Sequence, residues 1–126
     1  WGISNSMSKQ WCLEVLKDAI EKHGRPEILN SDQGSQYTSF TWTNYLEKQG
    51  IKISMDGKGR ATDNAWIERF WKSIKYDHIY LNPCDNGLEL FEGVRDHIEY
   101  YNQKIHQTIR KKPNEAYHES ICKEAA

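Results

Sequence analysis

The sequence contains little proline, cysteine or methionine and no long apolar run. Its 126 residues include three Pro, three Cys and two Met. The cysteines are odd in number, widely spaced and without a Cys-x-x-Cys pair, so neither a zinc site nor a disulfide framework is indicated. Reduced thiols favour an intracellular protein. Because no stretch approaches the length of a transmembrane helix and no signal peptide is recognisable, we expect no membrane partner.

The chain also lacks an excess of charge of either sign. The chain has seventeen Lys and Arg and eighteen Asp and Glu, which gives a formal net charge of −1. Whole-chain charge therefore gives no argument for nucleic-acid binding. The basic residues do gather in two segments, 51–75 and 104–112, and such clusters can hold phosphates. Charge alone favours the simpler interpretation, in which both segments are solvated faces.

Apolar periodicity and chain-breaking residues predict an α/β arrangement within a single domain. Hydrophobic residues make up only 37% of the chain, so its five Trp and seven Tyr supply much of the area that a core could bury. Among them we expect Trp11, Trp66 and Trp71 in the core. Gly24 and Gly50 each end a helix. We expect strands at residues 27–30 and 51–55, and helices at 8–23, at 41–49, from Thr62 or Asp63 to about 77, at 88–105 and from Pro113 onwards.

Two carboxylates, Asp32 and Glu68, are distinguished by their positions. Asp32 lies at the carboxyl end of the first expected strand, and open α/β sheets bind ligands at the carboxyl ends of their strands. Glu68 lies on an expected helix, with thirty-five residues between the two acids. Taken alone, Asp32 is a common turn former, and Glu68 is well placed for an ordinary exposed pair with Lys72. Together the two acids can meet at one divalent metal site, which phosphoryl transfer on DNA requires.

Short motifs surround these acids. They are Ser-Asp-Gln-Gly-Ser-Gln-Tyr-Thr-Ser at 31–39, Gly-Ile-Lys-Ile-Ser-Met at 50–55, Gly-Lys-Gly-Arg at 57–60, Asp-Asn-Ala at 63–65, then Glu68 and Lys75. A looser piece contains Tyr101, Asn102, His106, Pro113 and Tyr117. In these motifs the sequence resembles the catalytic region of DDE transposases of bacterial insertion sequences, within the retroviral-integrase superfamily. The looser piece lacks an Arg that is usual before the histidine.

The resemblance implies a partial RNase H-like α/β domain over residues 1–126, with two short parallel strands, four to five helices and a helical tail from about residue 88. The family carries a further Asp on the first strand of the domain, well upstream of the second. Only thirty-one residues precede Asp32, so we expect the first three strands and that Asp to be absent. Glu14 and Asp18 lie in a helical pattern and do not replace it. The uncovered apolar face predicts exposed apolar surface, pairing with a second copy or marginal stability.

The resemblance also implies roles for individual residues. Asp32 and Glu68 are the implied catalytic acids and ligands of a two-metal Mg²⁺ site, which Mn²⁺ would also fill and which is incomplete in this chain. Helical spacing places Glu68, Lys72 and Lys75 on one face. The implied DNA contacts are Lys58, Arg60, Lys72 and Lys75, and the residues implied to shape the site are Gln33, Gly34 and Asn64.

Plainer roles remain open for several of these side chains. Asn64 is also suited to capping the helix, and Gln33 and Gly34 to shaping the loop without touching DNA. Four histidines show no metal-ligand spacing and are expected at the surface: His23, His78, His97 and His118.

These assignments predict DNA transposition, in which a DDE transposase cleaves DNA strands and joins them to a target in a Mg²⁺-dependent reaction. The chain on its own is expected to be inactive or nearly so. The alternative is a catalytically inactive fragment that binds DNA or dimerises and has a regulatory role. The expected partners are DNA, as element ends and target, and further copies of the chain, and no small-molecule substrate is expected. The resemblance implies a location in the bacterial cytoplasm, in association with the nucleoid.

Overall fold

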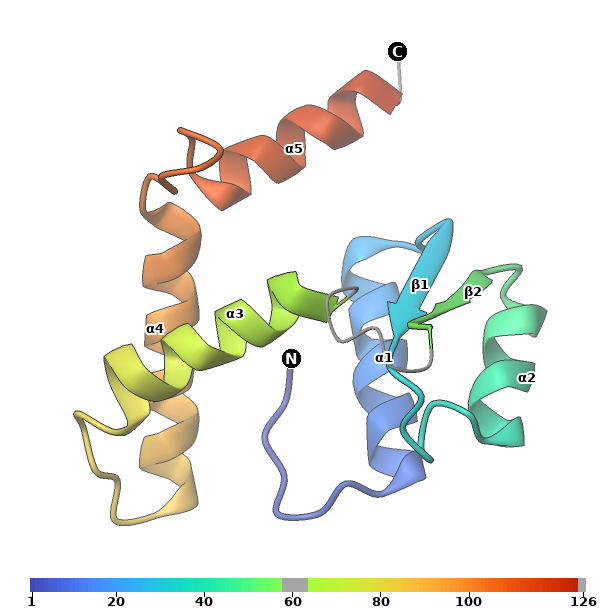
Figure 1. The fold of residues 1–126 in the computed structure, drawn as a ribbon, viewed down its shortest axis with the longest axis horizontal. Coiled ribbons are helices and arrows are strands. Elements are labelled where there is room, and N and C mark those ends of the chain that lie inside the picture. The colour runs from blue at the N-terminus through green and yellow to red at the C-terminus, as the bar shows by residue number, and fades with distance from the viewer. Residues whose placement is uncertain (58–63, 125–126) are drawn as a thin grey trace. The chain divides into compact units, whose positions relative to one another are not determined.

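The computed structural model describes residues 1–57 and 64–124, which form helices and one small sheet (Figure 1). Five α-helices and two parallel strands occur within these ranges, which confirms the α/β prediction. In the same ranges, no helix combines the length and apolarity needed to cross a membrane. The elements in chain order are α1 (Lys9–His23), β1 (Ile28–Ser31), α2 (Phe40–Lys48), β2 (Lys52–Met55), α3 (Ala65–Ile74), a π-helix (Lys75–Ile79), α4 (Gly87–Gln103) and α5 (Pro113–Glu124).

The chain divides into two compact units, Trp1–Glu68 and Arg69–Ala126. The first unit contains a β-α-β arrangement of β1, α2 and β2, preceded by α1. The strands pair in parallel, with Ile28 opposite Lys52 at one end and Ser31 opposite Met55 at the other. Parallel neighbours cannot be joined by a tight hairpin, and α2 supplies the crossover.

Helix α1 begins and ends where local sequence signals place it. The side chain of Ser8 accepts a hydrogen bond from the backbone N–H of Trp11 at 3.1 Å, which caps the first turn. Gly24 follows the last turn with a φ of 83°, a conformation that favours glycine. Between these residues, Cys12 and Leu16 are buried, so the helix presents one apolar stripe to the core.

The core of the first unit lies between helices α1 and α2 and one face of the sheet. On α2, Trp42 is buried and Leu46 has an exposed fraction of 0%. Leu29 and Ile53, which are register partners, pack against this core. Because side chains alternate along a strand, Asn30 lies on the opposite face of the sheet.

In the second unit, α4 packs against both the π-helix and α5. Val94 on α4 and Ile74 at the end of α3 are buried. The Phe70 and Tyr101 rings meet edge to face, with centroids 4.9 Å apart.

The helix expected to run to about residue 77 changes its hydrogen bonding after Ile74. Residues Lys75–Ile79 form a π-helix, and the backbone N–H of Tyr80 donates to the carbonyl of Lys75 at 2.9 Å. A Cβ added at Gly93 of α4 would lie 2.5 Å from Nε2 of His78. The π-helix therefore packs closely on α4 at a glycine, a tertiary contact that helical periodicity cannot predict.

Large apolar side chains remain exposed, which confirms the expectation of exposed apolar surface. The exposed fraction is 55% for Ile28 on β1, 80% for Trp66 and 41% for Trp71. The prediction that Trp66 and Trp71 lie in the core is therefore wrong, whereas Trp11 does pack against it. A helix with apolar residues around most of its circumference buries only the side that meets a neighbour, and on α3 the ring of Phe70 makes such a contact.

Candidate active site

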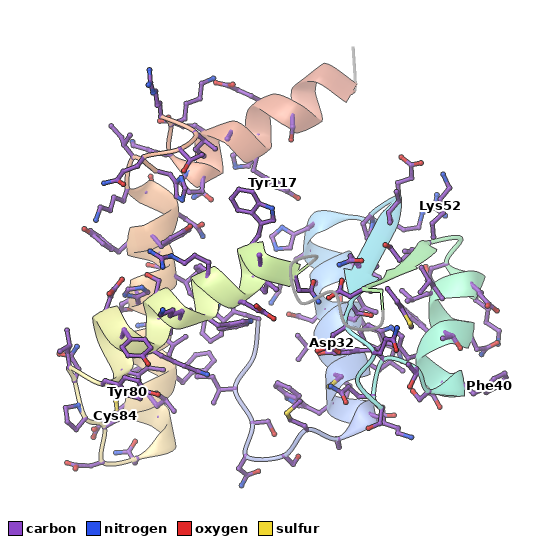
Figure 2. All side chains as sticks on the ribbon, in the orientation of Figure 1. Asp32, Phe40, Lys52, Tyr80, Cys84 and Tyr117 are labelled. Carbon is purple, nitrogen blue, oxygen red and sulfur yellow. The ribbon has the colours of Figure 1, made fainter. Side chains whose placement is uncertain are left out.

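Asp32 lies directly after β1, at the carboxyl end of the sheet (Figure 2). Its Oδ1 accepts a hydrogen bond from the backbone N–H of Gly34 at 2.8 Å, which forms a tight turn next to the acid. The residue is exposed. Because an ionised carboxylate has about four lone-pair positions, Asp32 keeps capacity for a metal ion while it holds the turn. The turn-forming and metal-binding interpretations are compatible.

Gly34 leaves the space that this arrangement needs. A Cβ at position 34 would lie 2.9 Å from Oδ1 of Asp32 and 2.8 Å from Nε2 of Gln36. Both distances are shorter than real Cβ contacts, so any side chain at this position would displace the two neighbouring groups. The turn thus has a steric reason to contain glycine.

Gln33 connects the same loop to the neighbouring strand. Its Nε2 donates a hydrogen bond to the backbone carbonyl of Asp56 at 2.9 Å. The backbone N–H of Asp56 in turn donates to the carbonyl of Ser31 at 3.1 Å. Two hydrogen bonds therefore connect Asp56, which follows β2, to Ser31 and Gln33 on either side of Asp32. The side chain of Gln33 contacts the protein backbone, as the loop-shaping role requires.

Asp56 is a polar residue of the site that the sequence interpretation missed. Its exposed fraction is 8%, and its Oδ1 accepts a hydrogen bond from Nδ2 of Asn30 at 3.0 Å. In the strand register, Asp56 follows Met55 as Asp32 follows Ser31, so the two acids come after adjacent strand ends. The available signal was an Asp within two residues of the end of each of the two expected strands.

Asn64 stands immediately before α3, and Glu68 lies in the first turn of that helix. Oδ1 of Asn64 accepts a second hydrogen bond from Nδ2 of Asn30, at 3.1 Å. The side chain of Asn64 is therefore attached to β1. Glu68 is exposed and, like Asp32, belongs to the first unit.

The cations expected to bind DNA are only partly described. Lys58 and Arg60 lie outside the described residues. Lys72 is exposed, and its Nζ lies 5.8 Å from the centre of the Tyr76 ring. Lys75 is also exposed, but it begins the π-helix, so the α-helical spacing argument for one shared face ends at this residue.

The second basic segment, residues 104–112, makes ion pairs with α5. Nζ of Lys111 lies 2.5 Å from Oε2 of Glu119, and Nζ of Lys112 lies 3.4 Å from Oε1 of Glu115. These pairs neutralise part of the segment and support its interpretation as a solvated face.

The described residues contain no group of three or more His, Cys, Asp or Glu side chains placed to hold a metal ion. The carboxylates at the ends of the two strands are Asp32 and Asp56, of which only Asp32 is exposed. An exposed carboxylate at a sheet edge is the kind of oxygen donor that Mg²⁺ prefers.

His78 and His97 form a ring pair in the second unit, with centroids 5.4 Å apart. Both are half-buried, so they are less exposed than residues on an open surface. Nε2 of His97 is buried and has no hydrogen-bond partner among the described residues. Burial lowers the pKa of His97, His78 lowers it further, and Asp77 opposes the shift.

The stability of the second unit is expected to fall in acid because of His97. Its folded-state pKa is lowered, so below about pH 6.5, the ordinary histidine value, the unfolded chain binds the proton more readily. The loss begins as the pH falls through that value and levels off below the folded-state pKa. Urea unfolding at about pH 8 and about pH 5.5 measures it. The difference in unfolding free energy between the two pH values should shrink in His97→Gln. It should persist in the control His118→Gln, where the histidine is exposed. An unchanged difference in His97→Gln would contradict this origin.

Two family models match most of the sequence. Residues 1–61 match a model described as "Integrase core domain", and residues 49–114 match a second model with the same description. The matches include Asp32 in the first segment and Glu68 in the second.

Curated relatives of the chain come from bacterial insertion sequences. The putative transposase InsK of insertion sequence element IS150 from Escherichia coli K12 is 36% identical over 109 residues, a match that covers 81% of this chain and 38% of that protein. The transposase of IS904 from Lactococcus lactis is 35% identical over 107 residues, with coverages of 82% and 42%. The IS600 31 kDa protein from Shigella sonnei is 30% identical over 130 residues, with coverages of 100% and 48%. The chain thus spans less than half the length of these relatives.

Solved structures share the fold. A chain of the simian T-cell lymphotropic virus intasome, solved with the PP2A regulatory subunit B56 gamma, superposes with a TM-score of 0.74 at 19% identity, covering 86% of this chain and 40% of that one. The HTLV-2 integrase catalytic core domain, solved with magnesium, superposes with a TM-score of 0.57 at 22% identity, with coverages of 85% and 68%. The fold is therefore that of an integrase catalytic core, which is RNase H-like. Family models, transposase relatives and fold agree, and the chain belongs to the integrase core domain family of insertion-sequence transposases.

Proposed function

We propose that residues 1–126 form the C-terminal part of a DDE transposase catalytic core, which cleaves DNA strands and joins them to a target. The observation that carries this proposal is the placement of two acids in one unit. Asp32 follows β1 at the sheet edge, and Glu68 lies in the first turn of α3. DNA, as element ends and target, is the substrate, and the reaction takes place on the bacterial nucleoid in the cytoplasm.

Asp32 and Glu68 would hold Mg²⁺, or Mn²⁺ in its place. Both are exposed carboxylates, and Asp32 keeps free lone-pair positions beside its turn hydrogen bond. When bound, two such ions activate the attacking oxygen and stabilise the leaving oxygen of the phosphodiester. The residues of this chain supply the oxygen ligands and hold them at the sheet edge.

The rest of the protein is proposed to supply the first three strands and the first catalytic Asp. Within the described residues the sheet has the order β1-β2, and no strand pairs with the other edge of β1. Ile28 on this strand is 55% exposed, as expected for a strand whose neighbour is missing. The length of the relatives leaves room for such a segment. Residues 88–126 are then the helical tail of the same domain.

DNA phosphates are proposed to contact Lys58, Arg60, Lys72 and Lys75. Lys72 and Lys75 are exposed and follow Glu68 along the same helical segment. Cations that contact DNA neutralise its phosphates and make the binding dependent on salt. Further copies of the protein complete the assembly on two DNA ends.

A second candidate is a catalytically inactive fragment that binds DNA or dimerises and so regulates the complete enzyme. The exposed apolar side chains Ile28 and Trp66 favour this function, because such surface is suited to pairing with another chain. A DNA-joining assay separates the two candidates. It uses the upstream-extended protein, meaning this chain together with the segment proposed to carry the first three strands and the first catalytic Asp, and compares it with its Asp32 and Glu68 variants.

Replacing Gly34 by alanine is expected to weaken the site without unfolding the protein. The added methyl would lie 2.9 Å from Oδ1 of Asp32, so the carboxylate must move from its turn hydrogen bond. In the upstream-extended protein, we expect the Mg²⁺ concentration for half-maximal DNA joining to rise about tenfold, as for loss of a group that orients a metal ligand. The matched control is Gly87→Ala, since nothing lies within 4 Å of a Cβ there. Equal Mg²⁺ dependence in Gly34→Ala and the parent protein would show that Asp32 does not need this turn.

A further inference from the structure

The side chain of Asn30 links three segments that are distant in the sequence. Its Nδ2 donates to Oδ1 of Asp56 at 3.0 Å and to Oδ1 of Asn64 at 3.1 Å. A primary amide has two N–H donors, so this one group can make both bonds at once. It thereby joins the end of β1 to the residue after β2 and to the residue before α3.

Asp56 is held from several directions. Its side chain accepts from Asn30, its carbonyl accepts from Gln33, and its N–H donates to the carbonyl of Ser31. Asp56 is only 8% exposed, and the Asn30 amide gives its carboxylate the hydrogen-bond partner that a buried charge needs. Asp56 is therefore an anchor for the loop that carries Asp32 and, through Asn30, for Asn64.

We propose that Asn30 and Asp56 are positioning residues that hold the first turn of α3, and with it Glu68, relative to the loop of Asp32. This inference rests on the proposed function of the two acids. Glu68 follows Asn64 by four residues, which is about one helical turn. Holding Asn64 therefore holds the N-terminal end of the turn that carries Glu68. Metal ligands have to be held within about 0.5 Å of their working geometry. A hydrogen bond across thirty-four residues serves this purpose better than a local cap, which leaves the helix free to move as a body.

The network can be broken and rebuilt by exchanging its chemical groups. In Asn30→Asp both donors are lost, and the introduced carboxylate faces the Asp56 carboxylate and the Asn64 oxygen. In the double variant Asn30→Asp with Asp56→Asn, the amide introduced at position 56 donates to the carboxylate at position 30. The Asn64 amide, once flipped, donates to the same carboxylate. Both hydrogen bonds return with their directions reversed.

The first readout is amide hydrogen exchange in the 126-residue chain, which requires no activity. In Asn30→Asp we expect exchange in the first two turns of α3 to accelerate about tenfold or more, exchange in α1 to stay unchanged, and the double variant to restore α3. The control is Asn86→Asp, the same chemical change at the cap of α4, where the side-chain oxygen accepts from Leu88 and Glu89. The inference is overturned if α3 is unaffected, or if α1 and α3 accelerate equally and the double variant restores neither.

The second readout is DNA joining by the upstream-extended protein. Asn30→Asp should raise the Mg²⁺ concentration for half-maximal joining, or lower the rate, by about 10–100-fold, as loss of a group behind a metal ligand does. The double variant should recover most of this loss, which a purely structural defect at position 30 would not show. If Asp32→Asn and Glu68→Gln remain active, the proposed function fails. If those variants are inactive while Asn30→Asp is unchanged, only the positioning inference fails.

Discussion

Asp32→Asn and Glu68→Gln are each expected to reduce DNA strand transfer by the upstream-extended protein by about 10²–10³-fold or more. Each change removes the charge of a proposed metal ligand, and metal ions supply several kcal/mol of transition-state stabilisation, with each 1.4 kcal/mol worth about tenfold in rate. Both changes keep the size of the side chain. The amide introduced at position 32 can still accept the hydrogen bond from the N–H of Gly34, so the turn should survive.

Strand transfer is measured with labelled element-end DNA and a target plasmid across a range of Mg²⁺ and Mn²⁺ concentrations. The matched control is Asp18→Asn, an exposed acid on α1 whose ion pair with Lys22 at 2.8 Å is a surface feature worth little stability. Full activity in both Asp32→Asn and Glu68→Gln would contradict the catalytic assignment. Loss of activity in both, with normal activity in the control, supports it. An extended protein that binds DNA but never joins it would favour the regulatory candidate.

Leu46→Ala is expected to destabilise the first unit by about 2–5 kcal/mol. Leu46 has an exposed fraction of 0% and lies in the cluster formed by α1, α2 and Ile51. Removing its branched end leaves a cavity that neighbouring side chains cannot fill completely, because protein cores are closely packed. A loss of this size is a large share of the stability of a small domain, so the urea midpoint of the unit is expected to fall clearly.

Phe40→Ala on the same helix is the matched control. Phe40 is 81% exposed and lies at the outer side of α2 (Figure 2), so its truncation should change stability by less than about 0.5 kcal/mol. Urea unfolding followed by circular dichroism compares the two variants with the parent chain. Similar midpoints for Leu46→Ala and Phe40→Ala would mean that the core does not lie between α1, α2 and the sheet.

Local signals in the sequence were sufficient for the five α-helices and two strands, apart from the change to a π-helix after Ile74, and for the position of Asp32. Ser8 and Gly24 bound α1 because a side-chain cap and a positive φ are properties of single residues and their near neighbours. The strand before Asp32 and the helix with Glu68 follow from short apolar patterns that end at recognisable residues. The family motifs are local as well, which is why they could be read before any contact was known.

Contacts between distant residues were decided only by the tertiary structure. Asn30 meets Asp56 and Asn64 across 26 and 34 positions, and His78 meets His97 across two helices. These partners depend on strand register, on which face of the sheet each side chain occupies, and on how closely two helices approach. No periodicity along the chain carries that information. The positions of Asp32 and Glu68 on their elements could therefore be predicted from the sequence, whereas the hydrogen bonds from the Asn30 amide to Asp56 and Asn64 emerge only from the folded arrangement.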